Sequence, residues 1–143
     1  MIVEALRQLV PEKHLRKRHS RTLDLRVELS RALRARQTTE ALQLYELIEK
    51  QKPDEPRWSH RKGDLLQKMG REDEAVVAYE RAVSLYAARG FDARAAATAK
   101  VMLAIDPSKR EVLERIEANA ERRSHKQRHE AVRLAEALRM ARR

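Results

Sequence analysis

Hydrophobic residues recur at helical spacing along most of the chain, with polar residues between them. Over residues 23–51 an apolar side chain returns every three or four positions, which predicts two helices, with Thr38 or Thr39 as the cap of the second. The same spacing predicts a further pair of helices over 56–70 and 72–89. Because no stretch shows sustained alternation of apolar and polar residues, the pattern predicts an all-α fold.

Shorter patterns follow at the two ends of the chain. Residues 2–10 fit a short amphipathic helix, and residues 91–105 fit a helix of small residues that stops before an Asp-Pro pair. Ser108 is expected to cap another helix, and a last amphipathic helix is expected over 131–141. Residues 121–130 have no apolar side chain, so both a helix and a linker fit them. The expected turns lie near residues 37, 54, 70, 90 and 107.

One segment of the chain repeats at an interval of 34 residues. The sequence TEALQLY at 39–45 returns as DEAVVAY at 73–79, and Tyr45 recurs as Tyr79. A small-residue and aromatic pattern at this interval is typical of stacked helix–turn–helix units. Such units bury a continuous core between neighbours and leave an extended concave surface. The repeat therefore favours a binding scaffold over an enzyme.

Composition agrees with a small helical domain. The chain has 143 residues, with only 3 Gly and 4 Pro among abundant Ala, Leu, Glu and Arg, which are good helix formers. It has no Cys, which excludes disulfides and thiolate metal sites. The N-terminus lacks the pattern of a signal peptide, and no apolar run approaches the roughly 18 residues of a membrane span. We therefore expect a cytoplasmic protein that has no membrane contact.

The net charge of +10 lies mostly at the two ends of the chain. Six basic and two acidic residues give residues 1–21 a charge of +4, and eleven basic and six acidic residues give residues 108–143 a charge of +5. Residues 22–107 carry fifteen basic and fourteen acidic residues, which leaves +1. The two densest basic runs are KHLRKRHSR at 13–21 and RRSHKQR at 122–128. This distribution of charge predicts three parts: a basic N-terminal extension over 1–21, a nearly neutral repeat body over 22–107 and a helical C-terminal extension over 108–143.

The small and aromatic residues of the two long units fall at positions typical of one family. Residues 56–89 carry a small residue in the first helix, a glycine turn and a small–aromatic–small series: Gly63, Gly70, Ala75, Tyr79 and Ala82. Residues 22–55 match through Ala41, Tyr45, Ile48 and Pro53, and residues 90–107 match in part through Gly90, Ala95 and Ala99. In these features the chain resembles the tetratricopeptide repeats, with two to three units over 22–107.

Most of these residues also have a simple structural explanation. Ala41, Ala75 and Ala82 are small where two helix backbones approach closely, and Gly63 allows the paired helices of one unit to touch. The two repeated tyrosines are expected to fill the gaps between adjacent units. We therefore expect this set of residues to form the core rather than a site.

The resemblance implies that the first helix of each unit lines the concave face. This transfer predicts a positive lining for a protein partner, with these partner-binding residues: Arg26, Arg34, Arg57, His60, Arg61, Lys68 and Arg94. Guanidinium groups grip carboxylates in two places, so a partner with an acidic segment is expected. Some family members clamp a C-terminal carboxylate with asparagines as well, but Ser30 and Asp64 stand at those positions here. The prediction is therefore a general site for acidic segments.

Two functions of other classes stay open. The basic runs predict weak, nonspecific binding to nucleic acid, because charge positions a phosphate backbone without reading bases. The apolar residues of 131–141 predict either a cap for the stack or a surface for a second copy or a partner. His125 and His129 share a helical face with Glu121, but no further ligands complete a metal site. No phosphate loop or activated nucleophile is present, so we expect no enzyme, cofactor or metal.

Overall fold

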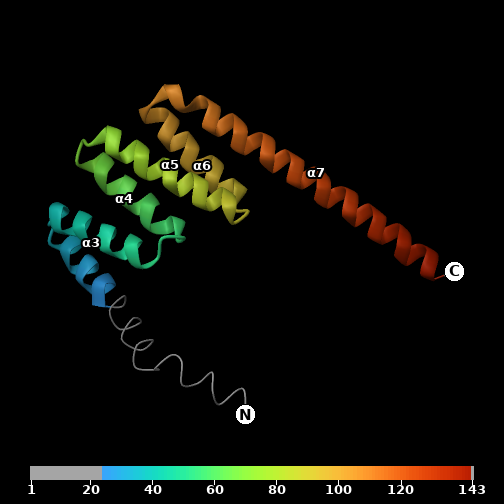
Figure 1. The fold of residues 1–143 in the computed structure, drawn as a ribbon, viewed down its shortest axis with the longest axis horizontal. Helices are drawn as coiled ribbons and strands as arrows, with labels where there is room; N and C mark the ends of the chain where they lie inside the picture. The colour runs from blue at the N-terminus through green and yellow to red at the C-terminus, as the bar shows by residue number, and fades with distance from the viewer. Residues whose placement is uncertain (1–23, 143) are drawn as a thin grey trace, which may run out of the picture.

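The computed structural model describes residues 24–142, and all regular structure among them is helical (Figure 1). These residues form an all-α helical-repeat fold, as the hydrophobic pattern predicts. In chain order the helices are residues 24–34, α3 (Thr38–Gln51), α4 (Pro56–Lys68), α5 (Glu72–Ala88), α6 (Asp92–Ile105), the 3₁₀ turn η1 (Pro107–Lys109) and α7 (Arg110–Ala141). The predicted helix over 2–10 and the basic run over 13–21 lie outside the described residues.

Three tight turns of the same kind fold the chain back on itself. Each places one residue in the left-handed region, with φ of 56° at Arg36, 73° at Gly70 and 75° at Gly90. In each turn the next backbone N–H reaches back five residues, as Arg71 N–H does to the Leu66 carbonyl at 2.9 Å. Glycine adopts this conformation without steric cost. At Arg36 the Cβ is crowded against the backbone, which costs about 1–2 kcal/mol. The turns predicted near residues 37, 70 and 90 are confirmed.

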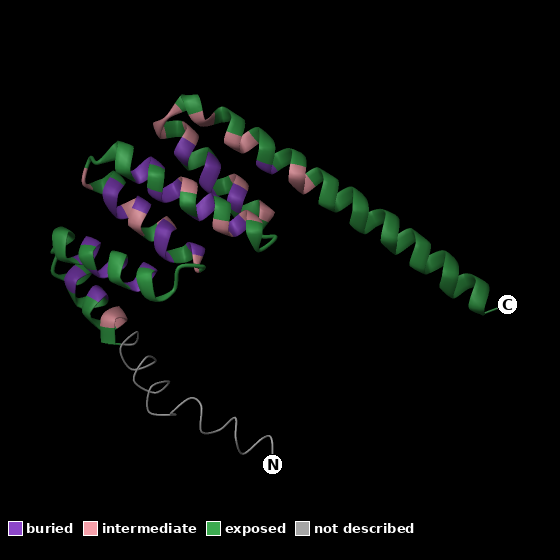
Figure 2. Cartoon of the chain, viewed as in Figure 1, coloured by how far each residue is buried: buried purple, intermediate pink, exposed green. Residues whose placement is uncertain are grey.

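The stacked helices carry most of the buried residues of the described chain (Figure 2), and the apolar side chains among them form the core. The small and aromatic residues of the repeat are buried, as predicted: Ala41, Tyr45, Ile48, Ala75, Tyr79 and Ala82. Met102 of α6 is fully enclosed together with Tyr79 and Ile48. Burial of such side chains stabilises the stack by roughly 1.5–3 kcal/mol each. The repeat phase in the sequence therefore marks the core of the molecule.

Helices α4 and α5 approach each other closely where Gly63 faces Tyr79. A Cβ on Gly63 would lie 2.8 Å from the Cδ1 and Cε1 atoms of the Tyr79 ring. Gly63 thus lets the two helices of this pair touch, as the sequence predicts. The expectation for the repeated tyrosines is right for Tyr45, whose ring lies 6.4 Å from that of Trp58 in the next pair. The ring of Tyr79 packs against the first helix of its own pair and belongs to the same core cluster as Met102 of the next pair.

Two helix caps differ from the sequence-based expectation. Gln37 is the N-cap residue of α3 without a side-chain hydrogen bond, and Thr38 is already the first helical residue. At η1 the cap is Asp106, whose carboxylate accepts from Ser108 N–H at 3.0 Å and from Ser108 Oγ at 2.7 Å. These two hydrogen bonds lower the pKa of Asp106. Ser108 therefore lies inside the turn as a donor rather than at its start as a cap.

Helix α7 is longer than the sequence pattern predicts. It runs without interruption from Arg110 to Ala141, so residues 121–130 are helical and join the two helices expected on either side. Its first turns pack on the neighbouring helices through Ile116, while every residue from Glu121 to Arg142 is exposed (Figure 2). No helix in the described part of the chain has the length and apolar character to cross a bilayer.

Candidate functional site

Side-chain contacts join the first helices of successive pairs. Arg26 of residues 24–34 stacks on Trp58 of α4, and His60 of α4 reaches Thr98 of α6. We call the solvent-facing residues of these three helices the first-helix face. All seven predicted partner-binding residues belong to these three helices, but their surroundings differ.

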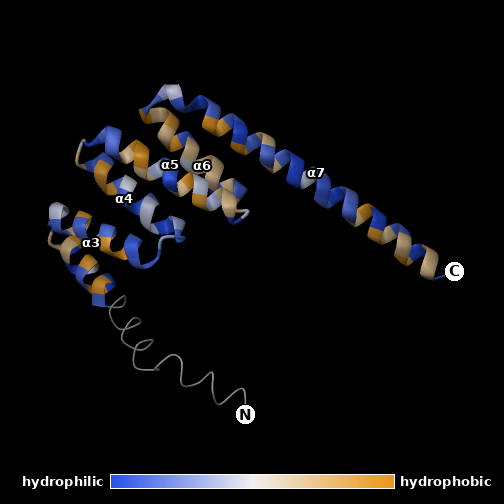
Figure 3. Cartoon of the chain, in the orientation of Figure 1, coloured by the Kyte–Doolittle hydropathy of each residue, from blue (hydrophilic) through white to orange (hydrophobic). Residues whose placement is uncertain are grey.

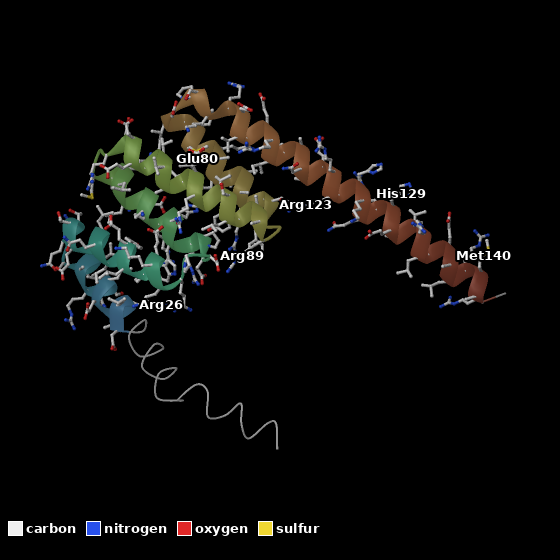
Figure 4. The ribbon with its side chains drawn as sticks, viewed as in Figure 1. Arg26, Glu80, Arg89, Arg123, His129 and Met140 are labelled. Carbon is white, nitrogen blue, oxygen red and sulfur yellow. The ribbon has the colours of Figure 1, made fainter. Side chains whose placement is uncertain are left out.

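Two of the predicted arginines are held by a tryptophan. The guanidinium carbons of Arg26 and Arg57 lie 5.1 Å and 5.5 Å from the centre of the Trp58 ring, at cation–π distance. Arg57 also donates to Glu55 Oε1 at 2.8 Å, and this hydrogen bond lowers the pKa of Glu55. Arg26 lies at the N-terminal end of the described stack (Figure 4). These contacts fix the direction of both guanidinium groups before any partner arrives.

The same stack contains two buried donors without an acceptor. Within the described part of the chain, neither Arg26 Nε nor the indole Nε1 of Trp58 has a hydrogen-bond partner. Trp58 is itself only 4% exposed. The indole ring thus serves mainly as a buried platform that carries the two arginines.

His60 joins the first-helix face to the core. Its ring forms T-shaped pairs with the rings of Tyr79 and Tyr86, with 5.8 Å and 6.0 Å between the ring centroids. Its Nδ1 lies 3.3 Å from the Thr98 hydroxyl. Its Nε2 lies 3.8 Å from Asp64. The histidine therefore contacts three helices and is better placed to hold α4, α5 and α6 together than to reach a partner.

Asp64, one of the acids on this face, is engaged by a neighbouring hydroxyl. The Tyr79 hydroxyl donates to Asp64 Oδ1 at 2.8 Å, and Gln67 Oε1 lies 3.1 Å from the same hydroxyl. Burial, followed by the hydrogen bond to Asp64, raises the pKa of Tyr79 well above its ordinary value. Asp64 is thus tied to a buried hydroxyl and does not neutralise the neighbouring cations by direct contact.

Four predicted cations remain exposed on the first-helix face. Arg34 donates to the Ser30 carbonyl at 3.2 Å, and the guanidinium of Arg94 lies 5.8 Å from the Phe91 ring centre. Arg61 and Lys68 form no hydrogen bond or ion pair with any residue that the structure describes. The four cations come from all three helices of the first-helix face.

Sequence reasoning missed a buried polar contact between α3 and α4. Glu49 accepts a hydrogen bond from Ser59 Oγ at 2.6 Å and another from Lys62 Nζ. The signal was present, because Glu49 follows Tyr45 by four residues and so continues the buried face of α3. A paired carboxylate at this position joins the first two helix pairs rather than forming a surface site.

The basic segment of α7 is partly used within the fold. Arg123 donates to the Ala87 carbonyl at 3.3 Å and to Asp92 Oδ1 at 2.9 Å, so it joins α7 to the turn between α5 and α6 (Figure 4). The His125 and His129 rings lie 5.9 Å apart on the exposed part of the helix. No group of three or more metal-ligating side chains occurs among residues 24–142.

Comparison with known proteins adds a general likeness. The sequence matches no protein-family model and no curated protein. Among solved structures the chain is similar to the TPR2B domain of yeast Sti1, solved in a complex with pHsp70. The identity is 19%, the match covers 71% of this chain and 97% of that one, and the TM-score is 0.38. At this level of similarity the fold assignment rests on the helix pairs described above.

Proposed function

We propose that the chain is a protein-interaction module of the tetratricopeptide-repeat kind that binds an acidic segment of a partner. The repeat units in this proposal are 22–55, 56–89 and a third that begins at residue 90. The binding surface is the first-helix face. The segment lies across the exposed cations of successive units, in the manner of other extended peptides held by basic surfaces.

The observation that carries this proposal is the state of the charges on α4. Arg61 and Lys68 are exposed and unpaired within the described chain, while Asp64 between them is engaged by the Tyr79 hydroxyl. A carboxylate that approaches this helix therefore meets cations without displacing an internal ion pair. Because exposed pairs contribute only about 0–1 kcal/mol each, several must act together along the segment.

The stacked arginines add direction to this surface. A guanidinium on an aromatic ring keeps its N–H groups free at the edge, where they bind a carboxylate in two places. The side chain of Arg57 is 52% exposed even though it is paired with Glu55. We place Arg57 and Arg26 at one end of the binding surface and Arg94 at the other, with Arg61 and Lys68 between them.

The test is selection from a random peptide library displayed on phage, with the intact chain as bait. We expect enrichment of peptides with several Asp and Glu residues. The variant Arg61→Glu/Lys68→Glu should lose these peptides, because it reverses the two unpaired charges. The matched control Lys50→Glu/Arg115→Glu makes the same charge change on the second helices and should retain them.

Circular dichroism of both variants checks that the fold is intact. Enrichment of peptides without acidic residues would contradict the proposal, as would equal retention by the two double variants. In either case the first-helix face would not be the site for acidic segments.

A further inference from the structure

The exposed end of α7 carries an apolar surface that no described part of the chain covers. Leu134 and Leu138 are 62% and 55% exposed, although they lie on a helix that begins in the core. Figure 3 shows hydrophobic positions along the last turns of α7. In proteins most of the stability of a helix comes from tertiary packing rather than from its intrinsic propensity. The projecting part of α7 therefore exposes large side chains on a helix that would gain stability from a partner.

One row of positions on this segment, polar at Ser124 and Gln127 and apolar from Ala131 onward, follows the spacing of a coiled coil. Along the projecting segment, steps of three and four residues alternate without a break and place six residues on one face: Ser124, Gln127, Ala131, Leu134, Leu138 and Ala141. We call these residues the α7 seam. Steps of this kind keep one face toward a neighbouring helix through several turns. The other exposed large apolar residues of this segment, Val132 and Met140, lie off the seam.

The seam has two halves with opposite shapes. A shallow hollow follows its first half, lined by Ala120, Glu121, Ser124, Gln127, Arg128 and Ala131. The second half projects the two leucines. A twofold axis between two antiparallel copies places the leucines of each copy against the hollow of the other. One chain therefore carries both parts of a self-complementary contact.

We propose that two copies of the chain pair through their α7 seams in antiparallel orientation. In this register Leu138 of one copy faces Gln127 of the second copy, and Leu134 faces Ala131. The numbers of two directly facing seam residues therefore add up to 265. Each leucine lies against the hollow of the other chain, beside the small side chains of Ser124 and Ala131. The paired segment, residues 124–141, is about 27 Å long at 1.5 Å per residue.

The body of the molecule and the flanking charges favour this register. Arg123 is the last residue of α7 that bonds to the repeat body, so residues 124–141 are the part free to pair along their whole length. The register also brings Glu121 beside Arg142 of the second copy. A parallel pair would place both repeat bodies next to each other at one end. It would also bring Arg123 beside Arg128 of the second copy, and these like charges repel.

Sedimentation velocity of the full chain over a concentration series tests the pairing. A seam of this length resembles the smaller, weaker interfaces, so we expect monomer near about 5 μM and dimer near about 500 μM. Leu134→Lys/Leu138→Lys should raise the dissociation constant by at least about tenfold, because it places charges in the seam. The control Val132→Lys/Met140→Lys adds the same charges off the seam and should leave dimerisation unchanged.

A monomer at the highest concentration, or a seam variant that dimerises like the parent, would overturn the proposal. A monomeric parent would leave the seam to a different chain. Circular dichroism of each variant shows whether α7 is still helical.

The chain has no native cysteine, so cross-linking can test the register directly. Chains with Ser124→Cys and chains with Ala141→Cys are oxidised separately and as a mixture. The antiparallel register predicts a cross-linked dimer that contains one chain of each kind, formed in the mixture only. Cross-linking of Ser124→Cys chains with one another would show parallel pairing and overturn the register.

Discussion

Helix α5 and the projecting end of α7 are both regular helices, but they differ in what covers them. Seven residues of α5 are buried between α4 and α6, whereas Ile116 is the one buried residue of the whole of α7. Helix α5 presents small and aromatic residues to its neighbours, so its backbone approaches them closely. The seam of α7 presents leucines beside a hollow and has no neighbour within the described chain.

This difference shows that two kinds of apolar pattern specify two kinds of contact. The 34-residue phase, with small residues at close crossings, predicts packing within the chain. The seam, with alternating steps of three and four residues, favours packing with a separate helix. Residues 24–120 and the projecting end of α7 should therefore respond very differently to substitution.

The largest expected contrast is between Tyr79 and Leu134. Tyr79→Ala should destabilise the fold by about 3–5 kcal/mol, because it removes a fully buried ring that also bonds Asp64. Leu134→Ala should change stability by less than about 0.5 kcal/mol at micromolar concentration, as is usual for an exposed side chain. Chemical denaturation monitored by circular dichroism measures both. Comparable losses in the two variants would contradict the division of the molecule into these regions.

A second contrast tests the close crossing of α4 and α5. In an exposed helix, replacing Gly by Ala stabilises by about 1 kcal/mol. At Gly63 the new Cβ would meet the Tyr79 ring at 2.8 Å, so we expect a loss of about 1–3 kcal/mol instead.

The control for this prediction is a double-mutant cycle that combines Gly63→Ala with Tyr79→Leu. If the clash is the cause, the cost of the alanine should fall by at least about 0.5 kcal/mol once the ring is absent. A stabilising Gly63→Ala would show that the two helices do not approach so closely.

The body of the fold could be read from the sequence because local signals agree there. The repeat phase, the glycine turns and the proline at the start of α4 all mark the same boundaries. The continuity of α7 stayed open in the sequence, because the run of polar residues over 121–130 fits a linker as well as a helix. The better signal is that no Gly or Pro follows Pro107, so nothing interrupts the helix.

The candidate site was predictable only in part. The spacing of Arg57, Arg61 and Lys68 along one helix follows from the sequence. The stacking of Arg26 and Arg57 on one tryptophan depends on how two pairs of helices pack, and no local pattern contains that information. His60 shows the same limit, because its contacts with α5 and α6 make it a packing residue as well as a member of the predicted face.

A smaller effect is expected from alkaline pH. Burial, then the hydrogen bond to Asp64, raises the pKa of Tyr79 above its ordinary value of 10.0. As pH rises past about 10, the unfolded chain loses this proton before the folded chain does, so the stabilisation present at lower pH is progressively lost. Tyr79→Phe should reduce this slope without abolishing it, because burial also raises the pKa of Tyr45. Denaturation at pH values on both sides of 10 measures the slope, and equal slopes in parent and variant would contradict the assignment.

The weakest expected interaction is with nucleic acid. The exposed cations near residues 122–128 should give sequence-independent binding at low salt that disappears near physiological salt, because released counterions drive it. Fluorescence anisotropy of a labelled oligonucleotide measures this. Replacing Arg122, Lys126 and Arg128 by Gln should weaken binding, whereas the same change at Lys50, Arg61 and Lys68 should have less effect. Binding that survives physiological salt and distinguishes sequences would make the basic helix the functional part of the chain.

Hydrogen exchange of the full chain tests the central contrast most directly. In dilute solution the amides of α5 should exchange orders of magnitude more slowly than those of residues 124–141, because a helix without tertiary contacts opens locally. At high concentration residues 124–141 should become protected in the parent but not in Leu134→Lys/Leu138→Lys. Equal protection of α5 and residues 124–141 in dilute solution would show that α7 is covered within the single chain, and would contradict the account.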